Sequence, residues 1–306
     1  MEVTSPAFWI GFHAIIAVLL YVDLRHYEKA KLTFRDSLFW TIIWIGLGLA
    51  FSVYIYWIYG IEEFIKYITA YVAEKTLSLD NIFVFLVIFS YFSVPERARH
   101  FILFLGIIFA ALFRAAFILV GVTLLERFHW MTYVFGAILL YSGYKMWESG
   151  GESVDPGRNK VIVFLKKHVP LVPEYRGNHI MIKLNGKTYF TPLALVLAAI
   201  ETTDIMFAFD SVPAVLAITR EFFTAYTSNI MAILGLRALY FLVEHGVQRI
   251  KGLGKALSLY LVYLGAVFLL TAFHIEVPSW VSLILILVIL AWGILHKEAV
   301  EKEVVK

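Results

Sequence analysis

The amino-acid sequence predicts an all-α polytopic membrane protein, and three observations point to this fold class. Apolar residues make up 61% of the 306 residues and charged residues only 16%, with a mean hydropathy of +0.80. An ordinary soluble protein has roughly 45–50% apolar and about 25% charged residues. Long apolar stretches recur along the chain, and lysine and arginine gather in alternate loops between them. We therefore expect lipid to surround most of the chain.

About nine transmembrane helices are expected, because nine apolar stretches are long enough to cross a bilayer at about 1.5 Å per residue. In chain order they are 7–24, 38–59, 66–92, 101–125, 130–147, 191–219, 227–246, 256–274 and 279–296. The first two form a peripheral N-terminal unit over 1–65, and the last belongs to a unit over 275–306 that ends in a cytoplasmic tail.

The distribution of basic residues predicts the orientation in the membrane. Twenty of the 26 lysines and arginines lie in one set of loops, and only Lys66, Arg127 and Arg220 lie in the opposite set. Cytoplasmic loops carry the excess of positive charge in membrane proteins. We therefore expect a multi-pass membrane protein with its N-terminus outside and its C-terminus in the cytoplasm.

The one long loop, 148–190, is expected on the cytoplasmic side. It begins with a Gly/Ser/Asp-rich linker, and the apolar and basic run 161–173 predicts a short amphipathic helix at the membrane surface. Asn185-Gly186 between two strand-like runs predicts a β-hairpin. We interpret the loop as a connector, with regulation or partner binding as the alternative.

Two parts of the chain resemble each other and predict an inverted repeat. Glu74-KTLSL-Asp80-Asn81 aligns with Asp204-IMFAF-Asp210-Ser211, FRAAFILV (113–120) with LRALYFLV (236–243), and FGAILLY (135–141) with LGAVFLL (264–270). The repeats, 66–147 and 191–274, each contain three spans, so the second has the opposite topology. Such a 3+3 core is a transporter architecture with its substrate site near the midplane.

Charged residues inside the spans predict where that site lies. Each costs about 2.5–3.5 kcal/mol at a helix centre unless it is paired or binds a ligand. They are Glu74, Lys75, Asp80, Arg114, Glu201, Asp204, Asp210 and Arg237. Five carboxylates and three cations leave a formal charge of −2, which suits one divalent cation.

The candidate ligands all offer oxygen, because the chain has no cysteine and neither motif contains histidine. Oxygen ligands favour Mg²⁺, Ca²⁺ or Mn²⁺. We take the metal ligands to be Glu74, Asp80, Asn81, Glu201, Asp204, Asp210 and Ser211. Supporting or gating roles are assigned to Lys75, Ser78, Thr202, Thr203, Arg114, Arg237 and Pro213. Arg114 and Arg237 either bridge to acids of the facing repeat or act as tethered cations that occupy the acids once the substrate has left.

Helix geometry adds an expectation about the two motifs. Six residues separate Glu74 from Asp80 and Asp204 from Asp210, which places each pair about 120° apart around an unbroken helix. Pro213 follows the second motif and lacks a backbone donor. We therefore expect the spans 66–92 and 191–219 to be bent or unwound near these acids, with freed carbonyls joining the site.

The motifs EKTLSLDNIFVF (74–85), FSYFSVP (89–95), ETTDIMFAFDSVPA (201–214) and TSNIMAILGLRALYFL (227–242) resemble those of the TerC family, and in particular its Alx-type manganese exporters. The resemblance covers nearly the whole chain. It implies a fold like that of LysE-superfamily transporters, an inner-membrane location and export of Mn²⁺, in a family named for tellurite resistance. It also implies that both acidic pairs, Glu201, Asn81 and Ser211 belong to the site. An acidic cavity would repel the tellurite anion itself.

The predicted function is export of Mn²⁺ by alternating access, with proton exchange as a further hypothesis. The alternatives are an exporter of another substrate such as Ca²⁺, or a membrane scaffold that delivers metal to secreted enzymes. No catalytic motif such as HExxH, Walker A or GxSxG is present, so we expect no enzyme activity. No cofactor is expected, and Mn²⁺ is the expected cargo. The small net charge of +3 argues against binding of nucleic acid. The sequence identifies no protein partner.

Overall fold

The computed structural model describes residues 6–27, 33–149, 156–246 and 251–295. Its elements are α1 (Pro6–Tyr27), α2 (Phe34–Tyr59), α3 (Ile61–Tyr91), α4 (Glu96–Arg127), α5 (Met131–Ser149), η1 (Pro156–Arg158), α6 (Lys160–His168), β1 (Met181–Leu184), β2 (Lys187–Phe190), α7 (Pro192–Ile218), α8 (Phe222–Ile233), α9 (Leu236–Gly246), α10 (Lys251–Ala272) and α11 (Ser279–Leu295). Apart from one short hairpin, the described chain is a bundle of helices. The expected cytoplasmic tail, 296–306, lies outside the described residues.

The length and composition of the helices fit a polytopic membrane protein. Six helical segments are long and apolar enough to cross a membrane, one of them formed by α8 and α9 together. They are Pro6–Arg25, Phe34–Tyr59, Glu96–Arg127, Pro192–Ile218, Phe222–His245 and Gly254–Ala272. The first carries mostly exposed apolar side chains and the joined α8–α9 segment is almost entirely buried. Lipid therefore contacts α1, whereas α8 and α9 lie inside the bundle.

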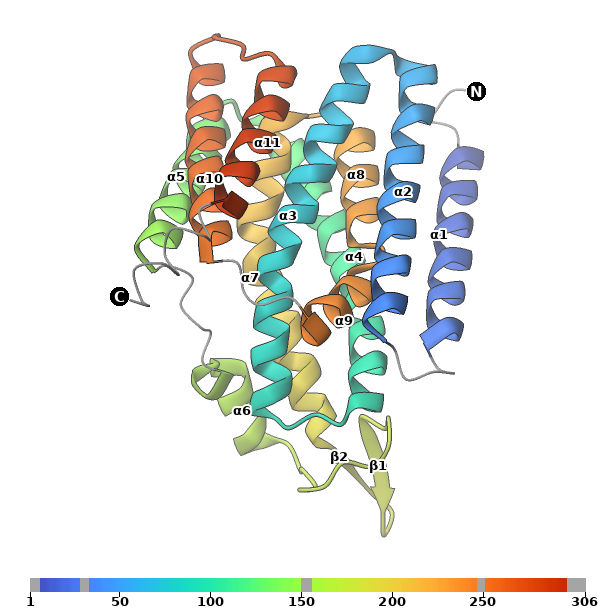
Figure 1. Cartoon of the computed structure of the whole chain (residues 1–306). Coiled ribbons are helices and arrows are strands. Elements are labelled where there is room, and N and C mark those ends of the chain that lie inside the picture. The colour runs from blue at the N-terminus through green and yellow to red at the C-terminus, as the bar shows by residue number, and fades with distance from the viewer. Residues whose placement is uncertain (1–5, 28–32, 150–155, 247–250, 296–306) are drawn as a thin grey trace, which may run out of the picture.

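The helices pack in an order that places α3 and α7 at the centre. In Figure 1, α5, α10 and α11 stand on one side of this pair, and α2 and then α1 stand on the other. Helix α3 contacts α7 and α8, α4 contacts the same two helices, and α5 packs along α10. Helices α3 and α7 run in opposite directions, as do α4 and α8, and α5 and α10 (Figure 1).

Helices α3 and α7, which we expected to be bent or unwound near the acidic motifs, are α-helical throughout and therefore not unwound there. Pro213 lies buried inside α7. A proline removes only one backbone donor, and tight packing on neighbouring helices allows a transmembrane helix to continue past it. The break falls instead between α8 and α9, where Gly235 has φ +78° and Trp44 of α2 packs directly against it. A side chain at Gly235 would have to share the space of that indole ring, and the left-handed conformation itself favours glycine.

Residues 156–191 form a small module at one end of the bundle (Figure 1). Strands β1 and β2 pair antiparallel, with Leu184 opposite Lys187, and turn through Asn185 and Gly186, both with positive φ. Two hydrogen bonds between described residues join the module to the bundle, and Lys166 Nζ lies 5.9 Å from the centre of the Phe92 ring. The Asn159 amide, which also caps α6, donates to Thr202 Oγ1 at 3.0 Å, and the Tyr175 hydroxyl donates to the Phe92 carbonyl at 2.6 Å. Burial raises the pKa of Tyr175, so this hydroxyl stays protonated at neutral pH.

Candidate functional site

Arg114 of α4 lies at the centre of the bundle and binds side chains from three other helices. Its Nη1 donates to a carboxylate oxygen of Glu74 on α3, to Asn229 Oδ1 on α8 at 2.9 Å and to Ser211 Oγ on α7 at 3.3 Å. Its Nη2 lies 3.9 Å from Asp204 Oδ1 on α7. The side chain of Arg114 is 1% exposed and that of Glu74 is fully buried. One cation is thus shared by two carboxylates within the membrane-spanning part of the chain.

Glu201 lies one helical turn before Asp204 on α7 and supplies a third carboxylate near this cluster. Both of its carboxylate oxygens are buried and have no hydrogen-bond partner among the described residues. Glu74 Oε2 and Asp204 Oδ2 are likewise buried without a partner. Buried carboxylate oxygens normally accept hydrogen bonds. These orphaned acceptors mark the cluster as a place where a cation or a proton would be bound favourably.

Asp80 and Asp210 do not join the Arg114 cluster. Each lies six residues beyond the acid that does, which is about 9 Å along a helix. Because α3 and α7 run in opposite directions (Figure 1), these displacements point toward opposite ends of the bundle. Asp210 accepts a hydrogen bond from Ser142 of α5. The expected acids are thus arranged at three levels rather than at one.

Three of the residues expected to have supporting or gating roles, Lys75, Thr202 and Thr203, donate hydrogen bonds to backbone carbonyls. Lys75 Nζ donates to the carbonyls of Ala232 at 2.9 Å and Leu234 at 3.1 Å, and so caps the end of α8 at the helix break. Thr203 bonds the backbone of its own helix, and Thr202 does so as well as holding Asn159. Ser78 and Asn81 are buried on α3.

Arg237 of α9 binds Asp23 of α1, a helix outside the two predicted repeats. Its Nη2 lies 2.8 Å from Asp23 Oδ2, and both side chains are buried. Arg237 also lines a cavity of about 20 Å³ together with Asp204. That volume is enough for one water molecule. Arg237, the second arginine of the repeat motif, therefore lies on the same small cavity as Asp204 of the Arg114 cluster. It forms an ion pair with Asp23 of α1, a helix outside the predicted core.

Sequence reasoning missed several side chains that complete these contacts. Asn229 and Ser142 are neutral, and Asp23 lies near the end of a span, so none was counted among the membrane-embedded charges. Their signal in the sequence is a polar side chain within a stretch of apolar residues. Polar groups in such positions usually face the bundle interior and bind a partner.

In the part of the chain that the structure describes, no three acidic or histidine side chains lie close enough to hold a metal ion together. Arg114 occupies the space between Glu74 and Asp204. The cluster as seen is therefore a closed arrangement in which a protein cation sits on the acids.

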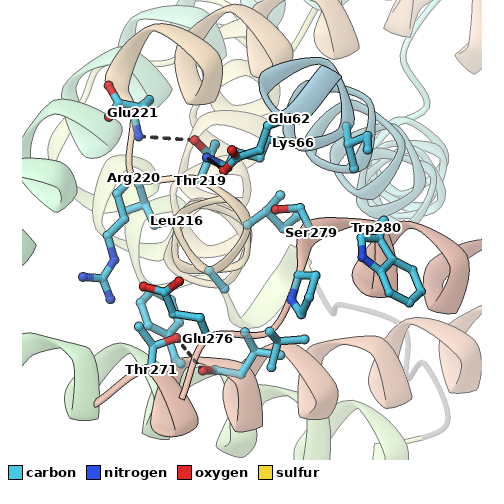
Figure 2. Close-up of a pocket in the computed structure, with 17 residues that line it drawn as sticks. Glu62, Lys66, Leu216, Thr219, Arg220, Glu221, Thr271, Glu276, Ser279 and Trp280 are labelled. Carbon is cyan, nitrogen blue, oxygen red and sulfur yellow. Dashed lines mark hydrogen bonds and ion pairs between the residues drawn. The ribbon is translucent and has the colours of Figure 1, made fainter. Parts of the chain in front are cut away.

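A larger cavity, of about 650 Å³, opens at the end of the bundle opposite the hairpin module. It lies between the start of α3, the end of α7 and the turn from α10 to α11. Figure 2 shows Glu62, Lys66, Arg220, Glu221 and Glu276 around it, with Lys66 bonded to Glu62. Its charged lining distinguishes this mouth from the apolar surface of the bundle.

These features define a class: a polytopic helical membrane protein with buried, partly unsatisfied charges at the centre of its bundle. Residues 59–304 match the model of the family described as integral membrane protein TerC, and the chain belongs to that family. A Myxococcus xanthus membrane protein, STKORF319, is 38% identical over 92% of this chain and 89% of its own length. The Escherichia coli K12 protein named "Putative membrane-bound redox modulator Alx" is 34% identical over 92% of this chain and 91% of its own length. No solved structure matches the chain.

Proposed function

We propose that this TerC-family protein is a transporter that exports Mn²⁺ from the cytoplasm through the cluster of Glu74, Asp204 and Glu201. The observation that carries the proposal is the sharing of Arg114 between Glu74 and Asp204, beside the unpartnered carboxylate of Glu201. With all groups ionised, three carboxylates and one arginine leave a formal charge of −2. One divalent cation would neutralise it.

Arg114 acts in this proposal as the tethered cation that stands in for the cargo. It already bonds two neutral acceptors, Asn229 and Ser211, besides the acids. When an ion arrives, the guanidinium retains these acceptors and releases the carboxylates to the metal. When the ion leaves, Arg114 returns to the acids, so the low-dielectric centre is never left with uncompensated charge.

An inverted repeat of α3–α5 and α7–α10 is part of the proposal, and the packing supports it. If α3 corresponds to α7, α4 to α8–α9 and α5 to α10, then the contact of α3 with α8 has its counterpart in that of α4 with α7. The contacts of α3 with α7, α4 with α8 and α5 with α10 each join two corresponding helices, so exchanging the repeats leaves them unchanged. All five of these helix contacts occur in the structure. Two such units moving against each other provide alternating access.

The three levels of acids supply a path for the ion. With the hairpin module on the cytoplasmic side, as the basic loops predict, Asp80 lies on the cytoplasmic side of the central cluster and Asp210 on the outer side. The ion would pass Asp80, bind at the cluster and leave past Asp210 toward the charged outer cavity. In this proposal the ion pair between Arg99 of α4 and Glu244 of α9 closes the inner end. The 2.8 Å hydrogen bond from Thr224 to Glu63 closes the outer end.

The name carried by the Alx relatives points to redox chemistry. Because this chain contains no cysteine, thiol–disulfide exchange between its own residues is excluded. In the present proposal, an effect on redox balance would follow from movement of the metal ion.

The test is Mn²⁺ flux into proteoliposomes containing the purified full chain. Glu74→Gln, Asp204→Asn and Glu201→Gln should each lower the rate at least about tenfold, since each removes a charge contact in a low-dielectric site. Glu174→Gln, which neutralises an exposed acid of the loop, is the matched control. Absence of Mn²⁺ flux with the wild-type chain would refute the transporter and favour the metal-delivery scaffold. Wild-type flux that is unchanged in all three central variants would refute the assignment of the site to these acids. Replacement of Mn²⁺ by Ca²⁺ or Mg²⁺ tests selectivity, and a pH-sensitive dye inside the vesicles tests proton exchange.

A further inference from the structure

An apolar cavity of about 340 Å³ lies where the hairpin module meets the bundle. It is bounded by Phe109 and Phe113 of α4, Leu197 and Ala198 of α7, and Leu165 and Phe190 of the module. The cavity is separate from the charged outer mouth, and apart from Glu201 the described residues that line it have apolar side chains. Its volume lies in the range of pockets that hold small organic ligands.

The exposed apolar side chains near the cavity indicate that it opens to the lipid bilayer. Phe109 is 37% exposed, and Leu112 and Leu119 on the same helix are exposed still more. Large apolar side chains with this exposure on a membrane-spanning helix face lipid tails. The cavity is therefore accessible from the bilayer, close to the membrane surface at the end that carries the module.

The module beside the cavity is strongly basic. Residues 160–190 contain six lysines and arginines and a single acid, Glu174, which is bonded to Arg176. Lys166 and Lys167 are exposed in the last turn of α6, the helix that contributes Leu165 to the cavity. Basic segments at a membrane surface attract anionic headgroups, by about 1 kcal/mol per residue.

Exposed apolar side chains on the module also indicate contact with the bilayer. Val161, Val163 and Phe164 of α6 are 40–58% exposed, and Met181 on the hairpin is 54% exposed. A helix with exposed apolar residues and lysines lies in the interface between headgroups and acyl chains. Such residues would be unfavourable in water, but they are suited to a module resting on the bilayer.

We propose that this cavity is a binding site for an anionic glycerophospholipid of the leaflet that the module contacts. One acyl chain enters between α4 and α7 and is covered by Leu165 and Phe190. The phosphate lies against Lys166 and Lys167. The chain runs along α7 from Ala194 toward Glu201, so the lipid closes the apolar side of the bundle beside the central cluster. The inference rests on the cavity and the basic module and does not depend on the nature of the cargo.

The proposal is tested by native mass spectrometry of the purified full chain titrated with phosphatidylglycerol or phosphatidylcholine of identical acyl chains. We expect one phosphatidylglycerol molecule to be retained, with at least about tenfold preference over phosphatidylcholine. The Lys166→Gln, Lys167→Gln double variant should abolish that preference, and Lys→Arg changes at the same positions should keep it. Both side chains are exposed, and the Lys→Arg variant keeps a cation beside Phe92, which Lys166 Nζ approaches to 5.9 Å. An unchanged Tm of the Lys→Gln double variant checks that the bundle is intact.

Ala198→Trp fills the cavity and should reduce retention of both lipids, whereas Leu119→Trp, on a lipid-facing part of α4 outside the cavity, should not. Free glycerol phosphate should not displace the bound lipid, which distinguishes a phospholipid from a soluble phosphate ligand. Equal retention of the two lipids by the wild type, or full retention by folded Ala198→Trp, would overturn the proposal. So would displacement by glycerol phosphate.

Discussion

Gly136 of α5 and Gly265 of α10 pack against each other without side chains between them. A Cβ atom built on Gly136 would lie 3.2 Å from the Gly265 carbonyl oxygen, and one built on Gly265 would lie 3.0 Å from the Gly136 carbonyl oxygen. The motifs FGAILLY and LGAVFLL align these two glycines with each other. Two inverted repeats are related by a rotation axis. A residue and its counterpart in the other repeat can contact each other only if both lie next to that axis. Their reciprocal contact therefore supports the repeat that we propose, and locates its axis between α5 and α10.

This contact predicts that Gly265→Ala destabilises the protein. Alanine favours a helix by about 1 kcal/mol over glycine, but here its Cβ would meet backbone atoms of α5, at an expected cost of about 1–3 kcal/mol. Gly46→Ala is the control, because nothing lies within 4 Å of a Cβ at that position in α2. Thermal unfolding in mild detergent, followed by tryptophan fluorescence, should show a lower Tm only for Gly265→Ala. Equal Tm values would contradict the close packing.

Arg114→Gln should be among the most destabilising substitutions in the chain. It leaves Glu74 and Asp204 buried without a cation, which we expect to cost about 3–5 kcal/mol. Adding Glu74→Gln to the same variant should restore part of the loss, because one buried charge is then removed. Arg176→Gln, which breaks the exposed pair with Glu174, should change stability by no more than about 1 kcal/mol. Chemical unfolding of the four purified proteins measures these differences, and a double variant no more stable than Arg114→Gln would count against the shared pair.

The buried pair of Asp23 and Arg237 should fasten α1 to the bundle. Asp23→Ala leaves the arginine without this partner, and we expect a loss of about 3–5 kcal/mol. Replacing both residues, with Asp23→Leu and Arg237→Met, should cost less than the single change, because apolar side chains of similar size can replace a buried pair. Tm measurements on the single and double variants compare them. A double variant that is less stable than Asp23→Ala would show that the ion pair itself contributes little to stability.

Lys75 should stabilise the break between α8 and α9. Lys75→Met removes the donors to two backbone carbonyls, and an unsatisfied buried acceptor costs about 1–3 kcal/mol. Amide hydrogen exchange should therefore become faster in residues 230–238 while the ends of α3 stay unchanged. Lys75→Arg, which keeps donors at this position, should restore slow exchange. The exposed Lys183→Met is the control, and faster exchange throughout the bundle in Lys75→Met would indicate general destabilisation instead.

The two outer acids should affect transport from opposite sides, if the proposed ion path is correct. Asp80→Asn should raise the KM for Mn²⁺ offered at the face with the hairpin module, and Asp210→Asn the KM for Mn²⁺ offered at the other face. In each case the loss of one carboxylate lowers local cation attraction by about 1 kcal/mol or more. Flux in proteoliposomes of known orientation separates the two effects. Equal changes at both faces would place both acids in a single site.

The polytopic helical fold, the turn at Asn185-Gly186 and the presence of buried acids could be predicted from the sequence because each depends on local information. Of the nine expected spans, six correspond to described helical segments that are long and apolar enough to cross a membrane. Hydropathy over about 20 residues predicts a crossing helix, and a glycine after asparagine favours a tight turn. Family membership likewise followed from contiguous motifs. Of the two alternatives expected near Pro213, a bent or an unwound helix, unwinding does not occur, because a proline's effect depends on the helices packed around it.

Which charges meet was decided by the tertiary structure alone. Helical spacing relates Glu74 to Asp80 within α3, but the pairing of Glu74 with Arg114, and of Asp23 with Arg237, depends on how neighbouring helices are rotated and shifted along their axes. Those relations arise from packing between segments up to 214 residues apart in the chain. The sequence by itself determined that charge would be buried in the membrane. The antiparallel placement of α3 and α7 decided that it would lie at three levels, with an arginine between the central acids.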